Sequence, residues 1–289
     1  MGSTRAIAIS GALGSGKSSV AKYLARRLGL QYVSTGDLQR SIASRRRLTT
    51  LELNRAAEQD QRIDDEVDDV LRGLAADGTP VVVDSRMAWW FVPNALSVHL
   101  TVDPAVAAER MHARRNQAAE EYTSREEAMR LAADRAQSER LRFRQLYDVD
   151  TARLRNYEVI VDTTSAPMEA VAEEVVAAYG EPPDPGAARP LRMMLSPAQV
   201  RPTRHVSASE LAEALSDEPI RVGFSHPYYF VAHGHARLAA ALRAGRTRVA
   251  ATLVAEGAET LDDGRTADDV YAEAAELDLR WDAVVGAGG

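Results

Sequence analysis

The chain has 289 residues, of which 45% are hydrophobic and 27% are charged, and its formal net charge is −7. It contains no cysteine, which excludes disulfides, thiolate metal sites and a cysteine nucleophile. The acidic balance argues against DNA as a partner. No apolar stretch approaches the roughly 18 residues of a membrane span, so we expect a soluble cytoplasmic protein that has no membrane partner.

Apolar runs alternate with helical patterns through the first 180 residues. The runs predict strands at residues 6–10, 32–33, 81–83, 98–102 and 159–161. Apolar residues at helical spacing predict helices at residues 18–28, 63–74, 103 to about 114, 124–146 and 168–179. Thr49 and Glu52 have the spacing of a capping box, which predicts one more helix start. Continuous apolar strands between helices are typical of a parallel sheet covered on both faces, so the predicted fold class is α/β.

The texture of the sequence changes at residues 181–190, where four of ten residues are proline. Such a segment forms neither regular helix nor sheet and is typical of a stiff linker. We therefore predict two domains, residues 1–180 and residues 191–289, which the linker holds at a semi-rigid distance from each other.

The stretch from Gly11 to Ser18 matches the pattern G-x-x-x-x-G-K-[ST] between a predicted strand and a predicted helix, which is the context of a P-loop. Glycines let the loop curl so that its backbone N–H groups point at phosphate oxygens, and the helix start adds positive potential. Lys17 is one of only two lysines in the chain and supplies a charge for the β- and γ-phosphates, while Ser18 is a ligand for Mg²⁺. The predicted phosphate-binding residues are Gly11, Gly14, Ser15, Gly16, Lys17, Ser18 and Ser19.

The apolar run Val81 to Val83 is followed by a carboxylate. Asp84 ends this run at the edge of the predicted sheet where ligands of open α/β sheets bind, and we predict that it serves the Mg²⁺ site with Ser18. The next residue is Ser85, where hydrolysing ATPases carry an acidic residue that activates water. This difference favours transfer to a bound acceptor over hydrolysis.

Several further segments, in the same order, resemble the nucleoside monophosphate kinases, most closely the archaeal-type cytidylate kinases. The resemblance covers residues 5 to about 178 and is carried by the P-loop and by residues 34–40, 62–64, 84–90, 109–115 and 138–150. It implies a P-loop kinase fold with a parallel sheet and a helical lid. It also implies Mg²⁺-dependent phosphoryl transfer from ATP to a nucleotide acceptor, CMP or dCMP.

The resemblance also implies which residues act on the acceptor and on the transferring phosphoryl group. It assigns acceptor binding to Thr35, Asp37, Arg40, Asp64 and Arg86, with a cap or turn role open for Thr35 and Asp37. It assigns catalysis to Lys17, Arg86, Arg110, Arg114, Arg115 and Arg135, of which the last four are lid arginines. Guanidinium groups suit this task because they donate paired hydrogen bonds to phosphate. Trp89 and Trp90 either stack on a base or pack in the core.

The family usually has glycine where this chain has Ser85 beside the acceptor site. This departure keeps a small-metabolite acceptor open as an alternative. A regulatory protein that senses nucleotides is the other alternative.

The second part of the chain resembles the ParB/sulfiredoxin-like superfamily through Gly234-His235-Ala236-Arg237, a Gly-x-x-Arg stretch that opens a helix. The resemblance implies a small α+β domain that binds a second nucleotide through Gly234, His235 and Arg237. The absence of cysteine excludes the sulfiredoxin reaction. Residues 256–289 are too short and too acidic for the DNA-binding domain of ParB proteins.

Overall fold

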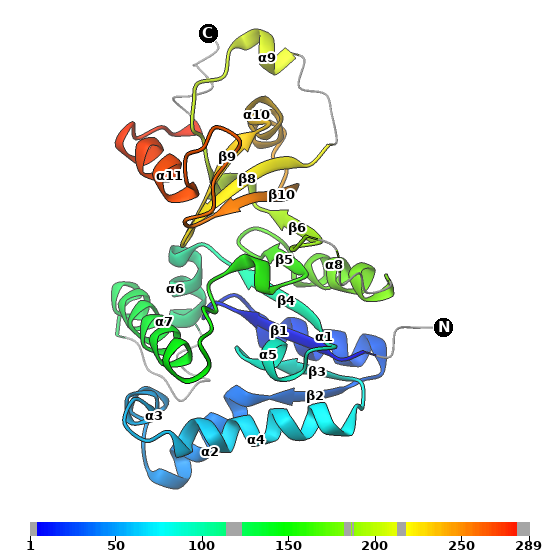
Figure 1. Ribbon diagram of the computed structural model, residues 1–289, viewed down its shortest axis with the longest axis vertical. Helices are drawn as coiled ribbons and strands as arrows, with labels where there is room; N and C mark the ends of the chain where they lie inside the picture. Colours follow the sequence, from blue (N-terminus) through cyan, green and yellow to red (C-terminus); the bar gives the residue numbers. More distant parts are fainter. Residues whose placement is uncertain (1–4, 114–122, 182–185, 187, 213–217, 282–289) are drawn as a thin grey trace.

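A computed structural model describes residues 5–113, 123–181, 186, 188–212 and 218–281. Five parallel strands form its first part, in the order β2-β3-β1-β4-β5 (Figure 1). They are β1 (Ile7–Gly11), β2 (Gln31–Ser34), β3 (Val81–Asp84), β4 (Leu96–Thr101) and β5 (Val159–Asp162). This is the predicted parallel sheet, and the carboxyl ends of its strands meet at one edge.

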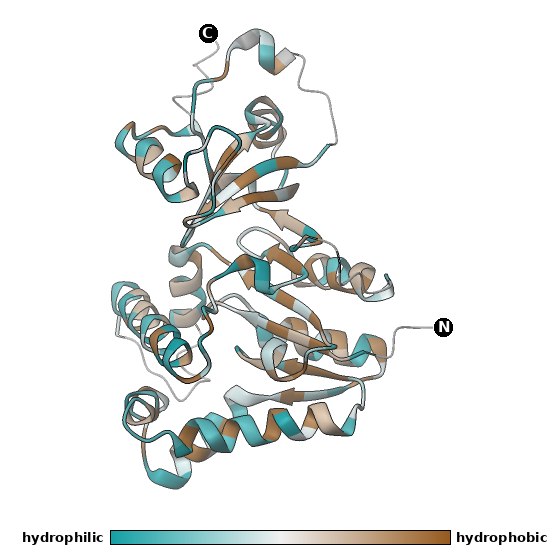
Figure 2. Ribbon diagram, in the orientation of Figure 1, coloured by the Kyte–Doolittle hydropathy of each residue, from teal (hydrophilic) through white to brown (hydrophobic). Residues whose placement is uncertain are grey.

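Helices cover this sheet on both faces, as the apolar strands predict. On one face α1 (Lys17–Leu28) and α8 (Met168–Gly180) pack against Ile7 and Ile9. On the other face α4 (Arg62–Asp77), α5 (Ala88–Phe91) and α7 (Arg125–Tyr147) pack against Ala6 and Ala8. Figure 2 shows the apolar residues gathered in the strands and the polar ones along α7. Because side chains alternate along the first strand, they pack into two separate cores, one on each face of the sheet.

Three more helices complete this part. Helices α2 (Thr35–Arg46) and α3 (Thr50–Ala57) form a small cluster with α4, and α6 (Pro104–Ala113) packs on α7. The pair α6 and α7 occupies the segment for which the resemblance implies a helical lid, and this role stays a prediction. Thr49 and Glu52 form the predicted capping box at the start of α3. The sequence pattern did not predict α2. Its residues are largely polar, and only a few of them, such as Ile42, are buried.

The sheet does not end at β5. Strand β6 (Arg192–Leu195) pairs in parallel with β5, and β10 (Val249–Glu256) pairs antiparallel with β6. The remaining strands are β8 (Ile220–Ser225), β9 (Tyr228–His233) and β7 (Val200–Arg201), which complete a ten-stranded sheet. The predicted distance between the two parts is therefore wrong, because the second part adds its first strand directly to the sheet of the first.

The second part is a small α+β unit, as predicted, and it shares a core with β5. It contains the short helices η2 (Pro197–Gln199) and α9 (Ala208–Ala212) and the longer helices α10 (His235–Arg243) and α11 (Ala267–Glu276). Its buried Leu195, Val222 and Val231 pack with Tyr157 and Ile160 of the first part. The ParB-like identity of this unit stays a prediction. In the described ranges no helix is long and apolar enough to cross a membrane.

The shared core predicts that the two parts unfold together. Replacing the fully buried Leu195 by alanine removes apolar contacts from a core that also contains Ile160, and we expect the free energy of unfolding to fall by about 2–5 kcal/mol. Denaturation followed by tryptophan fluorescence, which reports on Trp89 in one part and Trp281 in the other, is expected to give one transition at a lower midpoint. Two transitions, with the N-terminal part unchanged, would contradict a common core.

Candidate active site

The loop between β1 and α1 has the backbone that its glycines predict. Gly11 has φ 145°, and a Cβ atom there would lie 2.2 Å from the carbonyl oxygen of Leu100. Gly14 has φ 77°, and a Cβ atom there would lie 2.7 Å from the carbonyl oxygen of Ala107 in α6. Both positions therefore require glycine, because a Cβ atom there would clash with the backbone of β4 or of α6.

The remaining residues of the loop close it on itself at the start of α1. Gly16 is the left-handed N-cap of α1, and the backbone N–H of Ser19 donates to its carbonyl at 3.0 Å. The buried Ser15 donates its hydroxyl to the carbonyl of Ala12 at 2.8 Å. Lys17 donates its Nζ to the same carbonyl at 2.8 Å, so the ammonium group lies over the loop. Burial, together with the charge of Arg86, lowers the pKa of Lys17 to about 8.

Ser18 and Asp84 lie side by side at the carboxyl edge of the sheet. The Ser18 hydroxyl donates to Asp84 Oδ2 at 2.6 Å, and the Tyr32 hydroxyl donates to the same oxygen at 3.4 Å. A hydroxyl and a carboxylate at this separation fit Mg²⁺, which uses one or two protein oxygens and completes its shell with phosphates and water. Among the described residues there is no group of three or more metal-binding side chains, and a Mg²⁺ site of this kind needs none.

Two arginines meet beside Lys17 on one buried carboxylate. Arg86 follows β3 and forms an ion pair with Glu139 of α7. Arg135, one turn earlier on α7, donates its Nε to Glu139 at 2.8 Å. Burial alone would raise the pKa of Glu139, but the guanidinium groups of Arg86 and Arg135 hold it below its ordinary value. The ionised carboxylate thus keeps two cations together that would otherwise repel each other.

A cavity of about 180 Å³ lies next to these groups. It is lined by residues of the P-loop, of α2, α4 and α7, and by those that follow β3. The lining includes Lys17, Ser18 and Asp84, together with the pair Arg86 and Arg135. The site can therefore hold a second phosphate group facing the P-loop.

The predicted acceptor residues divide between this cavity and the surface. Thr35, Arg40 and Asp64 line the cavity. Thr35 donates its hydroxyl to the carbonyl of Asp84 at 3.4 Å. Asp37 forms an exposed ion pair with Arg40, and its backbone N–H donates to the N-cap side chain of Ser34 at 3.1 Å. The structure therefore gives Asp37 contacts typical of a first-turn residue.

Asp64 belongs to a buried pair that the sequence did not reveal. It faces Arg142 of α7, with 2.8 Å between Oδ2 and Nε, and both side chains are almost fully buried. One turn further along α4, Asp68 also lines the cavity and accepts a hydrogen bond from Tyr147. Burial raises the pKa of Asp68 to about 6. Sequence spacing offered one signal, since Asp64 and Asp68 are four residues apart on one face of a predicted helix.

The lid arginines are only partly placed. Arg110 of α6 donates to the carbonyl of Thr163 at 2.7 Å and to the carbonyl of Gly14 at 3.4 Å. It thereby ties α6 both to the P-loop and to the segment after β5. Arg114 and Arg115 lie outside the described residues.

Trp89 and Trp90 are not among the described residues that line the cavity. Trp89 donates its indole N–H to the carbonyl of Arg86 at 3.0 Å and packs edge-on against Tyr157. Trp90 is exposed to 46% of its surface. This arrangement favours the packing alternative for Trp89.

The predicted second nucleotide site lies at the start of α10. Gly234 has φ 95° and is the N-cap of this helix. Arg237 folds back over Gly234 and forms an ion pair with Glu218 at 2.9 Å. His235 is buried, with its Nε2 2.9 Å from the Thr203 hydroxyl. Nucleotide binding by these residues stays a prediction, and it would require Arg237 to exchange Glu218 for a phosphate.

Comparison with known proteins agrees with this geometry. Residues 7–132 match a family described as an AAA domain. The curated cytidylate kinase of Natronomonas pharaonis is 37% identical over 185 residues, which cover 62% of this chain and 93% of that protein. The cytidylate kinase of Haloarcula marismortui is 38% identical over 159 residues, which cover 54% of this chain and 80% of that protein. The similarity lies in the N-terminal part of the chain.

The carboxylate between the two arginines is testable by an isosteric change. Glu139→Gln keeps the side-chain volume but leaves two guanidinium groups near each other without a counter-charge, and we expect the free energy of unfolding to fall by about 3–5 kcal/mol. Denaturant titration measures this. Glu126→Gln, in the exposed first turn of the same helix, is the control and is expected to leave the value nearly unchanged. Equal stability of both variants would mean that solvent screens the arginines.

The lowered pKa of Lys17 predicts a pH dependence of triphosphate binding. Above pH 8 the free protein holds Lys17 neutral, whereas a bound triphosphate favours the charged form, so binding must take up a proton. We expect the affinity for MgATP, measured by calorimetry, to fall about tenfold from pH 7 to pH 9. Lys17→Ala is expected to bind more weakly at pH 7 and to lack this step. A flat profile for the unaltered protein would show that another group carries the charge.

Proposed function

Through its N-terminal part the chain belongs to the cytidylate kinase family and is a P-loop nucleoside monophosphate kinase, and we propose that it transfers the γ-phosphoryl group of ATP to CMP or dCMP. The observation that carries this proposal is the cavity that joins the P-loop to the paired arginines, because it provides adjacent sites for two phosphates.

The donor phosphates bind at the P-loop in this proposal. The loop backbone and the start of α1 face the β- and γ-phosphates, and Lys17 leaves the carbonyl of Ala12 to contact the transferring group. Mg²⁺, held by Ser18 and Asp84, would neutralise charge on the two terminal phosphates. Arg110 closes the P-loop side through its contacts with Gly14 and Thr163.

The acceptor phosphate binds in the same cavity, next to the P-loop. Arg40 and Arg86 donate to its oxygens, and Arg135, which shares Glu139 with Arg86, lines the same cavity. Attack brings two anions together, so the three guanidinium groups and Lys17 must supply the compensating positive charge. Glu139 does not contact the phosphates in this scheme and acts by fixing Arg86 and Arg135.

Two carboxylates support cytosine as the base. Asp64 and Asp68 line the cavity on α4, and carboxylate oxygens accept hydrogen bonds. Cytosine offers an amino donor at the position where uracil has a carbonyl acceptor. We therefore assign discrimination against uracil to this pair.

Ser85 bears on the alternative acceptors. Its hydroxyl accepts the backbone N–H of Met87 at 3.2 Å within the turn that follows β3. The extra side chain is thus engaged locally, which supports a nucleotide acceptor over a small metabolite.

An acceptor panel tests the proposal directly. The protein is incubated with ATP, Mg²⁺ and each of CMP, dCMP, UMP, AMP, GMP, shikimate or gluconate, and ADP is measured against a blank without acceptor. We expect CMP and dCMP to stimulate ADP formation most. Strong stimulation by a metabolite alone would favour the metabolite kinase, and ADP formation in no mixture would favour the regulatory protein.

Arg40→Ala is expected to weaken use of the acceptor while sparing ATP. The change removes a charge-assisted phosphate contact worth about 1.5–3 kcal/mol, so kcat/KM for CMP should fall about tenfold or more. Arg45→Ala is the matched control, because Arg45 lies on the same helix and pairs with Glu66 on the surface. A raised KM for ATP with an unchanged KM for CMP would assign Arg40 to the donor side.

A further inference from the structure

The lid of this kinase, formed by α6 and α7, is joined to the sheet by two stems. The entry stem is Asp103, which lies between β4 and α6. The exit stem is residues 148–156, which connect α7 to β5 and include the turn η1 (Leu154–Asn156). Each stem contacts the C-terminal unit, residues 191–281.

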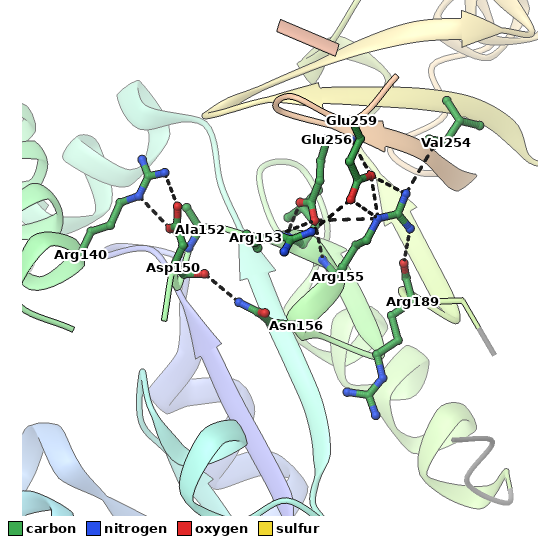
Figure 3. A network of polar contacts seen from close by, with 11 residues as sticks. Arg140, Asp150, Ala152, Arg153, Arg155, Asn156, Arg189, Val254, Glu256 and Glu259 are labelled. Atoms are coloured by element: carbon green, nitrogen blue, oxygen red, sulfur yellow. Dashed lines mark hydrogen bonds and ion pairs between the residues drawn. The ribbon is translucent and has the colours of Figure 1, made fainter. Parts of the chain in front are cut away.

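The exit stem is held by the carboxylates of Glu256, the last residue of β10, and of Glu259, three residues later (Figure 3). Glu256 is 6% exposed and accepts the backbone N–H groups of Leu154 at 2.7 Å and Arg155 at 3.3 Å. Glu259 accepts from the Arg155 side chain at 2.8 and 2.9 Å and from the Arg153 side chain at 3.1 Å. A buried carboxylate bonded to the first N–H groups of a turn fixes that turn strongly.

From η1 the contacts continue into α7. Asn156 donates its side-chain amide to the carbonyl of Asp150 at 2.8 Å, and the Asp150 carboxylate accepts Nε of Arg140 at 2.8 Å (Figure 3). Arg140 directly follows Glu139 in α7. The C-terminal unit is thus linked, through three hydrogen-bonded steps, to the turn of α7 that carries the carboxylate between Arg86 and Arg135.

The entry stem has one contact of the same kind. Gln199 of η2 donates its side-chain amide to Asp103 Oδ2 at 3.1 Å. The other oxygen of Asp103 accepts the backbone N–H groups of Ala105 at 2.8 Å and Val106 at 3.1 Å, so that Asp103 caps α6. Helix α6 carries Arg110, which contacts the P-loop.

We propose that the C-terminal unit braces the lid at both stems, and that Glu256 and Gln199 are positioning residues for phosphoryl transfer. The brace keeps the ends of α6 and α7 fixed to the sheet while the lid closes, so that Arg110, Arg135 and Glu139 return to the same places in each turnover. The Natronomonas pharaonis cytidylate kinase is matched over 93% of its length by 62% of this chain, which fits a brace that this protein carries in addition to the shared kinase part.

Hydrogen exchange tests the brace without any substrate, and so independently of the proposed function. Full-length Glu256→Gln is compared with the unaltered protein and with Glu273→Gln, a control that breaks an ion pair with Arg265 inside the C-terminal unit. Glutamine keeps only one acceptor oxygen, so at least one of the amides of Leu154 and Arg155 loses its partner directly, and these two amides report only the substitution. The brace requires amides of residues 136–147 to exchange about tenfold faster in Glu256→Gln alone, with β1 to β3 unchanged.

Exchange in α7 that stays unchanged while Leu154 and Arg155 speed up would overturn the brace. The same holds for acceleration in every element, which would mean that Glu256 serves only global stability.

Kinetics provide the second readout, and this one rests on the proposed function. In Glu256→Gln and Gln199→Leu, assayed well below their unfolding temperatures with ATP, Mg²⁺ and CMP, we expect kcat to fall about tenfold, because misplaced lid arginines act on the transition state. The KM for CMP is expected to stay within a factor of about two, because Arg40, which holds the acceptor phosphate in the proposed function, lies on α2 and not on α6 or α7.

An unchanged kcat in both folded variants would overturn the positioning role. If the unaltered protein phosphorylates none of the nucleotides, the proposed function fails, and the exchange experiment still decides whether the lid is braced.

Discussion

A phosphoryl-transfer site must gather positive charges that repel one another, and in this protein one buried carboxylate holds them in place. Glu139 binds Arg86, which follows β3, and Arg135 of α7, and all three line the same cavity as Lys17. Because its two partners come from different elements, the carboxylate also fixes α7 against the sheet. The cavity, the approach of the lid to the P-loop and the register of Asp64 with Arg142 all depend on that placement of α7.

Sequence reasoning succeeded where function is written into consecutive residues. The P-loop from Gly11 to Ser18 and the strand that ends in Asp84 could be predicted, because the backbone geometry of both depends on the local order of residues. It failed where partners are distant in the chain. Glu139 and Arg86 are 53 positions apart, and their ion pair depends on how α7 packs. Helix α2 lacks the apolar periodicity that would predict a helix.

The proline-rich segment shows why a compositional boundary is not a structural one. Residues 181–190 read as a linker in the sequence, and the strand that follows them has only four residues, Arg192 to Leu195. Nothing in those four residues says that their partner is β5 and not a strand of their own unit. The parallel pairing of β6 with β5 extends the sheet, and Ile160 and Val222 share one core, so the two parts are joined by both backbone pairing and apolar packing.

The order of strands has a consequence for how the protein is made. Strand β10 lies between β6 and β8, although it is the last strand of the chain. During synthesis on the ribosome, which proceeds from the N-terminus, the core that contains Tyr157 and Ile160 lacks Ala251 and Leu253 until residues 249–256 have emerged. Pairings between such distant segments also close slowly. The nascent kinase part is thus complete in sequence before this core is complete in structure, and transiently exposed apolar surface of this kind is prone to aggregation.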